Sequence, residues 1–384
     1  MKKRLLWVNG HLNAGGVEKS LVDILSHLDY NRYEVDLLLL EELGDYAPDL
    51  PPQVHVRFRC ITNTCGPVAR CLFRCIREHD WLALKMRLIF LLMKLFGPGK
   101  LRLARRLLTD GRHYDCAIGF RSGICTQVAA FAASADKRIT WWHHGAVNVD
   151  RDGYLESAGV CDRIAVVSEA CRKMLCEAFP TLEGKLMVVP NMVDCGEIGR
   201  KADAFQPYES NGLTHIVTLS RLAPEKHIQN VIFAAEKLKQ AGLRFQWHVV
   251  GGGALLRELE QGAAELGVSD VVRFEGSQPN PYPYLRCAEL LVHPSYTESQ
   301  GLVVLEAMGL GVPCVVTKSL GPCEFMEDGA NGILTEQSPE SLAEKVLEIL
   351  ADRGLYERIK ANTRCPERFE PERVMAQINE LLGG

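Results

Sequence analysis

The sequence predicts an α/β protein built from two doubly wound parallel sheets with helices on their faces. Short apolar runs alternate with longer amphipathic segments along most of the chain, which is the pattern of strand–helix units wound into a parallel sheet. The length of 384 residues is more than one compact core usually reaches. The periodicity also lapses in the polar stretch 196–212. We therefore predict two domains of ordinary size.

Apolar runs in the first half predict buried strands over 5–8, 35–40, 116–119 and 164–167. The amphipathic segment 17–28 predicts a helix between the first two strands. Residues 1–4 are basic, like the start of a signal peptide, but the apolar run that follows breaks at Asn9, far short of a signal peptide's apolar region. We expect this run to form the first strand of the sheet.

The second half repeats the rhythm more regularly. Its predicted strands are 215–219, 247–250, 271–274, 290–293 and 314–316, and the predicted helices among them are 227–241, 254–267 and 302–310. Ser338 and Pro339 supply an N-cap and a first-turn proline for a helix that reaches residue 352, and a last helix is predicted over 371–382. The longest lipophilic stretch is 88–96. It is interrupted by Lys94 and is too short to cross a bilayer of roughly 30 Å.

The composition is that of an ordinary globular protein, with 47% hydrophobic and 24% charged residues. Its 44 basic and 48 acidic residues give a formal net charge of -4, too near neutral to indicate nucleic acid as the main partner. The 14 cysteines include no C-x-x-C pair, so we expect no metal site and no disulfide. Scattered cysteines of this kind indicate a reducing compartment.

Two glycine-rich turns follow predicted strands. Gly15 and Gly16 lie between the first strand and the first helix, where backbone can approach a ligand and free N–H groups favour an anion. Taken alone, this pattern is equally that of a flexible turn. The second turn, 251–253, follows another strand, but Leu256 stands where a dinucleotide-binding G-x-G-x-x-G motif needs glycine. The second turn therefore argues against a dinucleotide site.

Two cations follow the strand at 215–219, at the edge where open α/β sheets bind ligands. Arg221 can grip two oxygens and Lys226 acts as a point charge, a combination that suits a diphosphate. From residue frequencies alone, Arg221 and Lys226 would more often be two solvated charges on the surface than a binding site.

A pair of glutamates lies further along the chain, where Glu298 and Glu306 enclose seven residues. That spacing also occurs elsewhere by chance, but here one carboxylate lies on a strand-exit loop and the other lies in an otherwise apolar helix, where it needs polar partners.

In combination, these segments resemble the GT-B glycosyltransferases of the large retaining family 4, the glycosyl transferases group 1, over most of the chain. The motifs that carry the resemblance are GGVE at 15–18, VVPNMVD at 188–194, SRLAPEK at 220–226, VVGGG at 249–253, the E-x7-E with its EAM continuation at 298–308, and GPCE at 321–324 before DGANG at 328–332. Met192 replaces the family's usual glycine. Ser299 and Gln300 stand where many relatives carry Gly-Phe, a departure that bears on donor-sugar contacts.

The resemblance implies two Rossmann-like domains that face each other across a cleft. Residues 1–195 would form an N-terminal domain on the acceptor side, and 196–365 would form the domain that binds a nucleotide-sugar. Residues 366–384 would form a C-terminal helix that returns to the N-terminal domain.

The resemblance also assigns roles to residues. Arg221 and Lys226 would neutralise the donor diphosphate. Glu306 would hold the ribose, and Glu298 would hold hydroxyls of the donor sugar. The donor-binding residues that the resemblance implies are Gly15, Gly16, Ser220, Gly251, Ser299, Gln300, Gly301, Leu302 and Glu306.

A family histidine that contacts the sugar near the reacting centre maps best to His144, because 142–145 looks like the family's W-x-H-G form. His143 competes for this role, and without the motif either would more often be structural. The predicted catalytic residues are His144, Arg221, Lys226 and Glu298.

The implied function is retaining glycosyl transfer that needs no metal and no cofactor, since the nucleotide-sugar is a co-substrate. The expected donor is a UDP-sugar, on the family's base rate alone. The expected acceptor is a glycan or lipid-linked molecule of bacterial surface polysaccharide or glycolipid synthesis. Two alternatives stay open: a nucleotide-sugar epimerase on the same fold, and a catalytically silent partner or sensor that kept the binding site. The joint presence of Glu298, Glu306, Arg221 and Lys226 favours an active enzyme.

The segment 57–112 is strongly basic, with thirteen Lys and Arg against three acidic residues. The excess of +10 leaves -14 for the rest of the chain. Apolar residues alternate with these cations over 82–96, which suits a helix resting on an anionic bilayer surface. The alternative is an ordinary helical pair with solvated charges. We therefore expect a cytoplasmic protein that could lie on the inner face of the cell membrane through 57–112, and no nucleic-acid partner, because no binding motif accompanies the charge.

Overall fold

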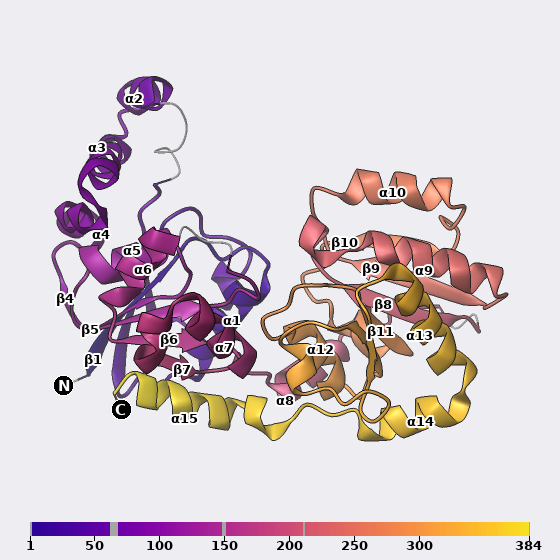
Figure 1. Ribbon diagram of the computed structural model, residues 1–384. Coiled ribbons are helices and arrows are strands. Elements are labelled where there is room, and N and C mark those ends of the chain that lie inside the picture. The colour runs from indigo at the N-terminus through magenta and orange to yellow at the C-terminus, as the bar shows by residue number, and fades with distance from the viewer. Residues whose placement is uncertain (1, 62–67, 148–150, 210–211, 384) are drawn as a thin grey trace. The chain divides into compact units, whose positions relative to one another are not determined.

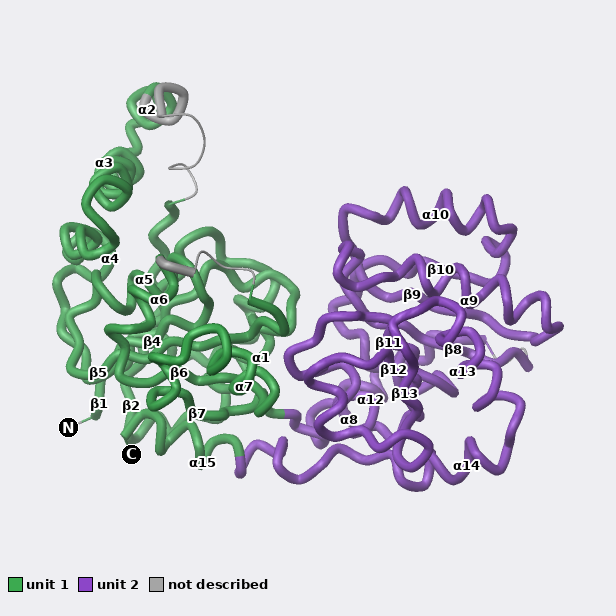
Figure 2. The backbone as a smooth tube through the Cα atoms, in the orientation of Figure 1, with its two compact units in different colours: residues 1–192, 374–384 green, residues 193–373 purple. Residues whose placement is uncertain are grey.

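The structure is a computed structural model that describes residues 2–61, 68–147, 151–209 and 212–383. The chain forms two compact units (Figure 2). Unit 1 consists of Met1–Met192 together with Val374–Gly384, and unit 2 consists of Val193–Arg373. The sequence analysis placed the boundary between domains at residue 196.

Unit 1 is built on a seven-stranded parallel sheet with the order β3-β2-β1-β4-β5-β6-β7 (Figure 1). The strands are β1 (Lys3–Asn9), β2 (Tyr33–Leu39), β3 (Val54–Phe58), β4 (His113–Gly119), β5 (Ser134–Trp142), β6 (Arg163–Val166) and β7 (Leu186–Val188). The helices are α1 (Gly16–His27), α2 (Val68–Arg77), α3 (Trp81–Phe96), α4 (Arg105–Thr109), α5 (Ile124–Gln127), α6 (Arg151–Gly159), α7 (Glu169–Ala178) and α15 (Pro371–Leu381). Shorter helical turns are η1 (Ala47–Asp49), η3 (Pro98–Ala104), η4 (Val128–Ala132) and η5 (Pro180–Lys185).

Both faces of this sheet are buried, which explains why its central strands are continuous apolar runs instead of alternating ones. In β1, Leu5 and Trp7 point into one core, while Leu6 and Val8 point into the other. The first core also contains Val374, Ile378 and Leu381 from α15. The last helix of the chain is therefore part of the hydrophobic core of unit 1.

Unit 2 has a six-stranded parallel sheet with the order β10-β9-β8-β11-β12-β13. The strands are β8 (Thr214–Leu219), β9 (Phe245–Val250), β10 (Val272–Gly276), β11 (Leu290–His293), β12 (Cys314–Thr317) and β13 (Ile333–Thr335). The helices are α8 (Cys195–Ala202), α9 (Gln229–Gln240), α10 (Leu256–Glu265), α11 (Tyr282–Arg286), α12 (Leu302–Gly309), α13 (Pro339–Ala351) and α14 (Arg353–Asn362), with turns η6 (Pro224–Lys226), η7 (Pro322–Glu324) and η8 (Glu367–Phe369). Two parallel, doubly wound sheets confirm the predicted fold class.

The basic segment forms helices beside the sheet of unit 1. Figure 1 shows α2 and α3 standing away from the strands. Asp80 caps α3 by accepting a hydrogen bond from the backbone N–H of Ala83 at 2.9 Å, and Gly97 ends the helix with a φ of 85°. Residues 62–67, which belong to the predicted basic segment, lie outside the described residues. In the described parts of the chain, no helix has the length and apolar character needed to cross a membrane.

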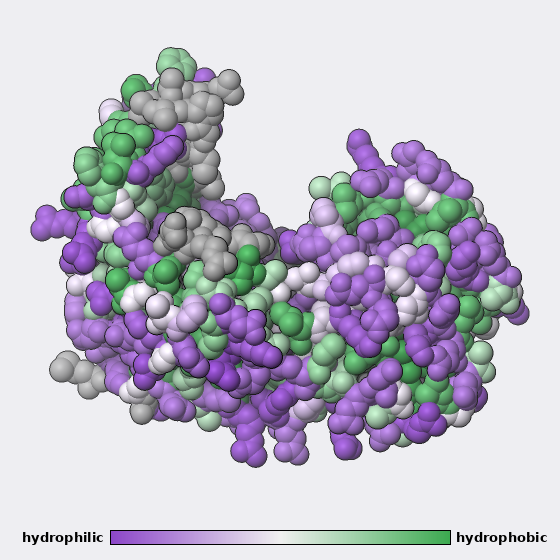
Figure 3. Space-filling view, viewed as in Figure 1, coloured by the Kyte–Doolittle hydropathy of each residue, from purple (hydrophilic) through white to green (hydrophobic). Residues whose placement is uncertain are grey.

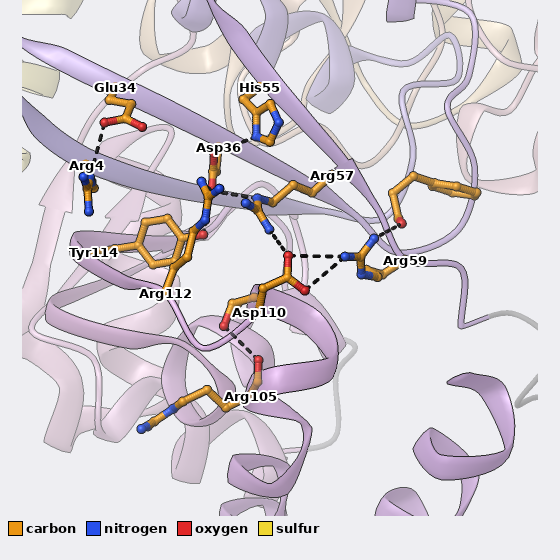
Figure 4. Close-up of polar contacts among 12 residues, drawn as sticks. Arg4, Glu34, Asp36, His55, Arg57, Arg59, Arg105, Asp110, Arg112 and Tyr114 are labelled. Atoms are coloured by element: carbon orange, nitrogen blue, oxygen red, sulfur yellow. Dashed lines mark hydrogen bonds and ion pairs between the residues drawn. The ribbon is translucent and has the colours of Figure 1, made fainter. Parts of the chain in front are cut away.

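A buried network of charges joins this segment to the sheet (Figure 4). Asp36 in β2 is only 4% exposed. It accepts hydrogen bonds from Arg57 Nε at 2.7 Å and from the Tyr114 hydroxyl at 2.7 Å, and His55 Nδ1 lies 3.0 Å away. Burial by itself would raise the pKa of Asp36, but these hydrogen bonds and the charges of Arg57 and Arg112 lower it.

The same network neutralises part of the basic charge of 57–112. Arg57 also donates to Asp110, and Arg59 Nη2 lies 3.2 Å from the other oxygen of that carboxylate. Arg112 Nη1 lies 3.4 Å from Asp36. Three of the thirteen cations counted in the sequence therefore hold the fold together and are not free to attract a partner.

Replacing Asp36 by Asn should lower the free energy of unfolding of unit 1 by about 3 to 5 kcal/mol, because it leaves buried Arg57 with one carboxylate partner fewer. Urea denaturation followed by tryptophan fluorescence measures this change. Since the pKa of Asp36 is lowered in the folded protein, its contribution is present at neutral pH and is lost as the pH falls below the carboxyl's ordinary pKa.

The matched control is Glu34→Gln, which removes a carboxylate from the neighbouring exposed ion pair with Arg4. It should cost less than about 1 kcal/mol. Equal losses in the two variants would contradict a stabilising role for the buried network.

Candidate functional site

The carboxyl ends of β8 and β11 form the centre of the candidate site in unit 2. These strands are parallel neighbours, so the loops that follow them leave the same edge of the sheet. The loop after β8 carries Lys226 and the loop after β11 carries Glu298. Lys226 Nζ donates to Glu298 Oε1 at 2.5 Å, and both side chains are largely buried. The structure thus brings together two predicted site residues that lie far apart in the sequence.

His293 completes this cluster, although the sequence analysis did not single it out. Its Nε2 lies 2.9 Å from the same Oε1 of Glu298, and the residue is only 3% exposed. Among the described residues, none offers a hydrogen-bond partner to its Nδ1. The signal that could have found it is its place as the single polar residue at the end of the predicted strand 290–293.

The cluster keeps Glu298 ionised. Burial would raise the pKa of this carboxyl, but the positive charge of Lys226 and the hydrogen bond from His293 outweigh burial and lower the pKa well below its ordinary value. A buried carboxylate with a fixed charge at neutral pH can accept hydrogen bonds from hydroxyl groups, which are chemically suited to it.

Arg221, in contrast, points toward solvent. Its side chain is 62% exposed, and its guanidinium group pairs with Glu225 at 3.1 Å instead of with Glu298. The structure therefore places Arg221 on the predicted loop but does not bring it into the Lys226–Glu298 pair. Ser220 begins the same loop, and its backbone N–H donates to Val250 at 3.0 Å.

The glycine turn after β9 packs tightly against this loop. Gly251 has a φ of 142°, and a Cβ there would lie 1.9 Å from the carbonyl oxygen of Ser220. The backbone N–H of Leu222 donates to the carbonyl of Gly252 at 2.8 Å. Glycine is therefore needed at these positions for packing, because the backbone of the loop after β9 lies directly against the backbone of the loop after β8.

At the start of α12, the backbone of the loop at 321–324 lies close to the backbone of the loop at 298–301. Gly301 caps this helix with a φ of 82°, and Gln300 is buried. A Cβ on Gly321 would lie 2.3 Å from the Cα of Gln300, and its N–H donates to the carbonyl of Glu298 at 3.0 Å. The loop at 321–324 thus supports the loop at 298–301. Leu302 begins α12, so the free N–H groups of its first turn lie at this edge of the sheet.

Glu306 lies within α12 among apolar neighbours and is 5% exposed. The hydroxyl of Tyr282 donates to its Oε1 at 3.0 Å. The predicted pair of carboxylates therefore occupies two environments, one beside a lysine and a histidine and the other beside a tyrosine. Ser299 lies half-buried on the loop between the two carboxylates.

In unit 1, the two predicted glycines lie at the start of α1. Gly15 is the N-cap and Gly16 the first helical residue. The φ of Gly15 is -175°, which any residue can adopt, so glycine is not required by backbone strain. A Cβ there would lie 2.6 Å from Glu18 Oε2, so a larger residue would make the end of the Glu18 side chain move. The buried carboxylate of Glu18 therefore lies directly against this turn.

The two candidate histidines of unit 1 have different surroundings. His144 Nε2 lies 2.8 Å from the hydroxyl of Ser122. The His143 ring lies 4.6 Å from that of Phe120, centroid to centroid. Burial, with the nearby His144 and Arg121, lowers the pKa of His143 to about 3, and burial and Arg121 also lower the pKa of His144. Both rings are therefore neutral at neutral pH, and His144 is the one hydrogen-bonded to a polar side chain.

Arg121 is a polar residue of this edge that the sequence analysis missed. Its Nη1 lies 2.9 Å from His11 Nε2 and 3.4 Å from Glu18 Oε1. Its position two residues after β4 is the signal that could have found it, because this is again a strand's carboxyl end. Within the residues described, no three or more His, Cys, Asp or Glu side chains gather in a way that could hold a metal ion.

A double-mutant cycle tests the buried pair. Lys226→Met and Glu298→Gln should each lower the thermal stability at neutral pH, while the double variant should lose less than the sum, with a coupling of about 1 to 3 kcal/mol. Because the pKa of Glu298 is lowered in the folded state, this coupling is fully present above the carboxyl's ordinary pKa and fades as the pH falls toward the lowered value. Additive losses at neutral pH would contradict a charge pair at this position.

Part of the chain matches a known protein family. Residues 200–365 match the family described as Glycosyl transferases group 1. The lipopolysaccharide core biosynthesis glycosyltransferase LpsE of Rhizobium meliloti is 34% identical over 170 residues, which are 44% of this chain and 49% of that protein. The chain thus aligns with about half of the length of that relative. A D-inositol 3-phosphate glycosyltransferase of Nocardiopsis dassonvillei is 29% identical over 96% of this chain and 89% of its own.

Solved structures agree on the fold. The crystal structure of Anabaena Alr3699/HepE in complex with UDP and glucose superposes with a TM-score of 0.73 over 99% of each chain, at 17% sequence identity. Both units of the chain therefore have the fold of the GT-B proteins, and the family match covers most of unit 2. The chain thus resembles the glycosyl transferases group 1 family in sequence over residues 200–365 and the GT-B proteins in fold over both units.

Proposed function

We propose that the chain is a retaining glycosyltransferase that needs no metal and transfers a sugar from a UDP-sugar to a glycan or lipid-linked acceptor in bacterial surface polysaccharide or glycolipid synthesis. The observation that carries this proposal is the buried Lys226–Glu298 pair beside the start of α12, at the carboxyl ends of β8 and β11. LpsE, by its name, acts in lipopolysaccharide core biosynthesis, which supports the acceptor class.

The first requirement of glycosyl transfer is that the enzyme stabilises the departing nucleoside diphosphate. When the bond between the sugar and the diphosphate breaks, negative charge develops on a phosphate oxygen, and fixed positive groups stabilise it. Lys226 and the first N–H groups of α12 supply such groups at one edge of the sheet. Arg221 is exposed and paired with exposed Glu225, so turning its side chain toward a diphosphate costs little.

The two carboxylates suit two sets of hydroxyl groups. We assign Glu306 to the ribose of the nucleotide, with Tyr282 orienting its carboxylate. We assign Glu298 to the donor sugar, because Lys226 and His293 already hold it ionised and oriented. Ser299, Gln300, Gly301 and Leu302 lie on the loop and helix start between these carboxylates, and complete the proposed donor site with Ser220 and Gly251.

Retention follows from attack on the face that the leaving group departs from. The acceptor hydroxyl forms the new bond to the anomeric carbon as the bond to the phosphate oxygen breaks, and the departing phosphate takes the hydroxyl proton. No enzyme nucleophile enters this scheme. From unit 1 we assign neutral His144 to a hydrogen bond with the sugar, and the turn at Gly15 and Gly16 to the donor. A cytoplasmic location is part of the same proposal.

The donor is tested by thermal stabilisation against UDP, GDP, ADP and CMP sugars and their free nucleotides, since a ligand of the folded state raises the melting temperature. UDP and one UDP-sugar should give the largest shifts. Glu306→Gln should weaken UDP binding by about ten-fold or more, because a charged hydrogen-bond acceptor is lost.

Glu340→Gln, at an exposed position of α13, is the matched control and should bind UDP like the wild type. If a GDP-sugar alone stabilises the protein, the UDP assignment is wrong. If none of these nucleotide sugars stabilises the folded protein, the proposed UDP-sugar donor is wrong.

The reaction is tested by the anomeric configuration of the product, read by NMR after transfer from the donor that the panel selects. The product should keep the configuration of the donor, and an inverted product would overturn the proposed mechanism. Lys226→Ala should lower kcat by about 100 to 1,000-fold, as for the loss of one electrostatic group that acts on the transition state. Lys360→Ala, on the exposed side of α14, should leave kcat unchanged.

A further inference from the structure

A hollow lined by arginines opens in unit 1, away from the candidate site. Its volume is about 460 Å³, within the range of small-molecule sites of about 300 to 1,000 Å³. It is lined by Arg102, Arg105, Ala130, Phe131, Arg138 and Val160. Phe131 comes just before β5 and Val160 just before β6, so the hollow lies toward the amino ends of these strands. His144 and the turn at Gly15 lie at the carboxyl ends.

The hollow concentrates unpaired positive charge. In the part of the chain that the structure describes, no carboxylate forms an ion pair with Arg102, Arg105 or Arg138. The nearby carboxylate of Asp162 accepts the backbone N–H of Arg138 at 2.7 Å. Arg105 Nε donates to the carbonyl of Ala132 at 3.2 Å, which fixes the guanidinium against η4.

This arrangement differs from that of the neighbouring arginines. Arg57, Arg59 and Arg112 are committed to Asp36 and Asp110, whereas Figure 4 shows the guanidinium of Arg105 turned away from the Asp110 carboxylate. Two of the segment's cations, Arg102 and Arg105, instead line the hollow together with Arg138. Guanidinium groups bind phosphate oxygens in pairs, so three of them around one hollow fit a phosphate group.

Two exposed apolar residues belong to the segments that line the hollow. Val160 is 48% exposed, and Leu103, next to Arg102, is 59% exposed. Leu103 belongs to η3, which packs against α3. The exposed apolar side chains of α3 are Trp81, Leu88, Leu91, Leu95 and Phe96. Figure 3 shows hydrophobic residues gathered over α3. A free phosphate ion does not need exposed apolar residues near its site. A phospholipid combines a phosphate group with apolar acyl chains and would use both.

We propose that this hollow binds the phosphate group of an anionic lipid, while Leu103, Val160 and the exposed side of α3 lie against the bilayer. Arg102, Arg105 and Arg138 would hold the phosphate, and Phe131 and Ala130 would contact the glycerol and upper acyl region. The membrane contact is then made at a defined lipid site as well as by the spread of basic charge over 57–112. This proposal does not depend on donor binding in unit 2, because its test measures binding to lipid alone.

Flotation with phosphatidylcholine vesicles, with and without phosphatidylglycerol, tests the proposal. The wild type should float with the anionic vesicles only. Arg102→Gln with Arg138→Gln should weaken this binding by more than the roughly five-fold per cation expected from the loss of charge at an anionic surface, because each guanidinium also donates hydrogen bonds to the phosphate. Arg105 is left intact because it also bonds the backbone. Leu103→Ser should weaken binding to the same vesicles.

Matched controls separate the hollow from charge and apolarity in general. Lys85→Gln with Lys94→Gln removes two exposed cations from α3 itself, and it should weaken binding less than the change at Arg102 and Arg138. Leu266→Ser, at an exposed apolar position of unit 2, should leave binding unchanged. The proposal is overturned if the hollow variant floats like the wild type, or if the α3 variant loses as much. It is also overturned if the protein ignores vesicles but inorganic phosphate raises its melting temperature and Arg102→Gln with Arg138→Gln abolishes that rise.

Discussion

Burial on both faces is the constraint on which the arrangement of polar groups in this protein depends. Each sheet is parallel and covered on both sides by helices, so burial favours apolar residues in the interior of its strands, or polar groups that are hydrogen-bonded. Thr218 in β8 shows the second case, since its hydroxyl donates to the carbonyl of Val292 at 2.8 Å and accepts from Trp247 Nε1 at 3.0 Å. Lys226, Glu298 and His293 lie at the ends of the strands, where polar side chains can meet a ligand.

The constraint explains why the sequence predicted most of the fold. Strands such as β1, β8 and β11 read as short apolar runs because both of their faces are buried. The strands that were missed lack this signal. β3 alternates apolar and polar residues, β5 begins with Ser134 and continues through Asp136, Lys137 and Arg138 before it becomes apolar, and β7 and β13 have only three residues each. These strands are recognisable only from the neighbours with which they pair.

The candidate site was predictable in its parts and not in its contacts. The sequence showed that Glu298 and Lys226 are charged residues that follow predicted strands. Their hydrogen bond depends on β8 and β11 being neighbours in the sheet, and the distance between two strands in the sequence does not predict this. The pairing of Arg221 with Glu225, four residues along the same loop, was equally invisible. The network around Asp36 joins residues from β2, β3 and β4, and it was missed because the order of the strands in the sheet is not visible in the sequence. The count of basic residues in 57–112 therefore included arginines that are paired with carboxylates in the folded protein.

The place of α15 has a consequence for the order of folding during synthesis. Unit 2 is one continuous segment, and all of its strands have left the ribosome before the last helix is made. Unit 1 needs Val374, Ile378 and Leu381 to complete one face of its core, and these residues follow the whole of unit 2 in the sequence. Although unit 1 begins first, it cannot finish until unit 2 has been synthesised. The apolar surface that α15 later covers stays exposed while unit 2 is being synthesised, and transiently exposed surface of this kind is prone to aggregate.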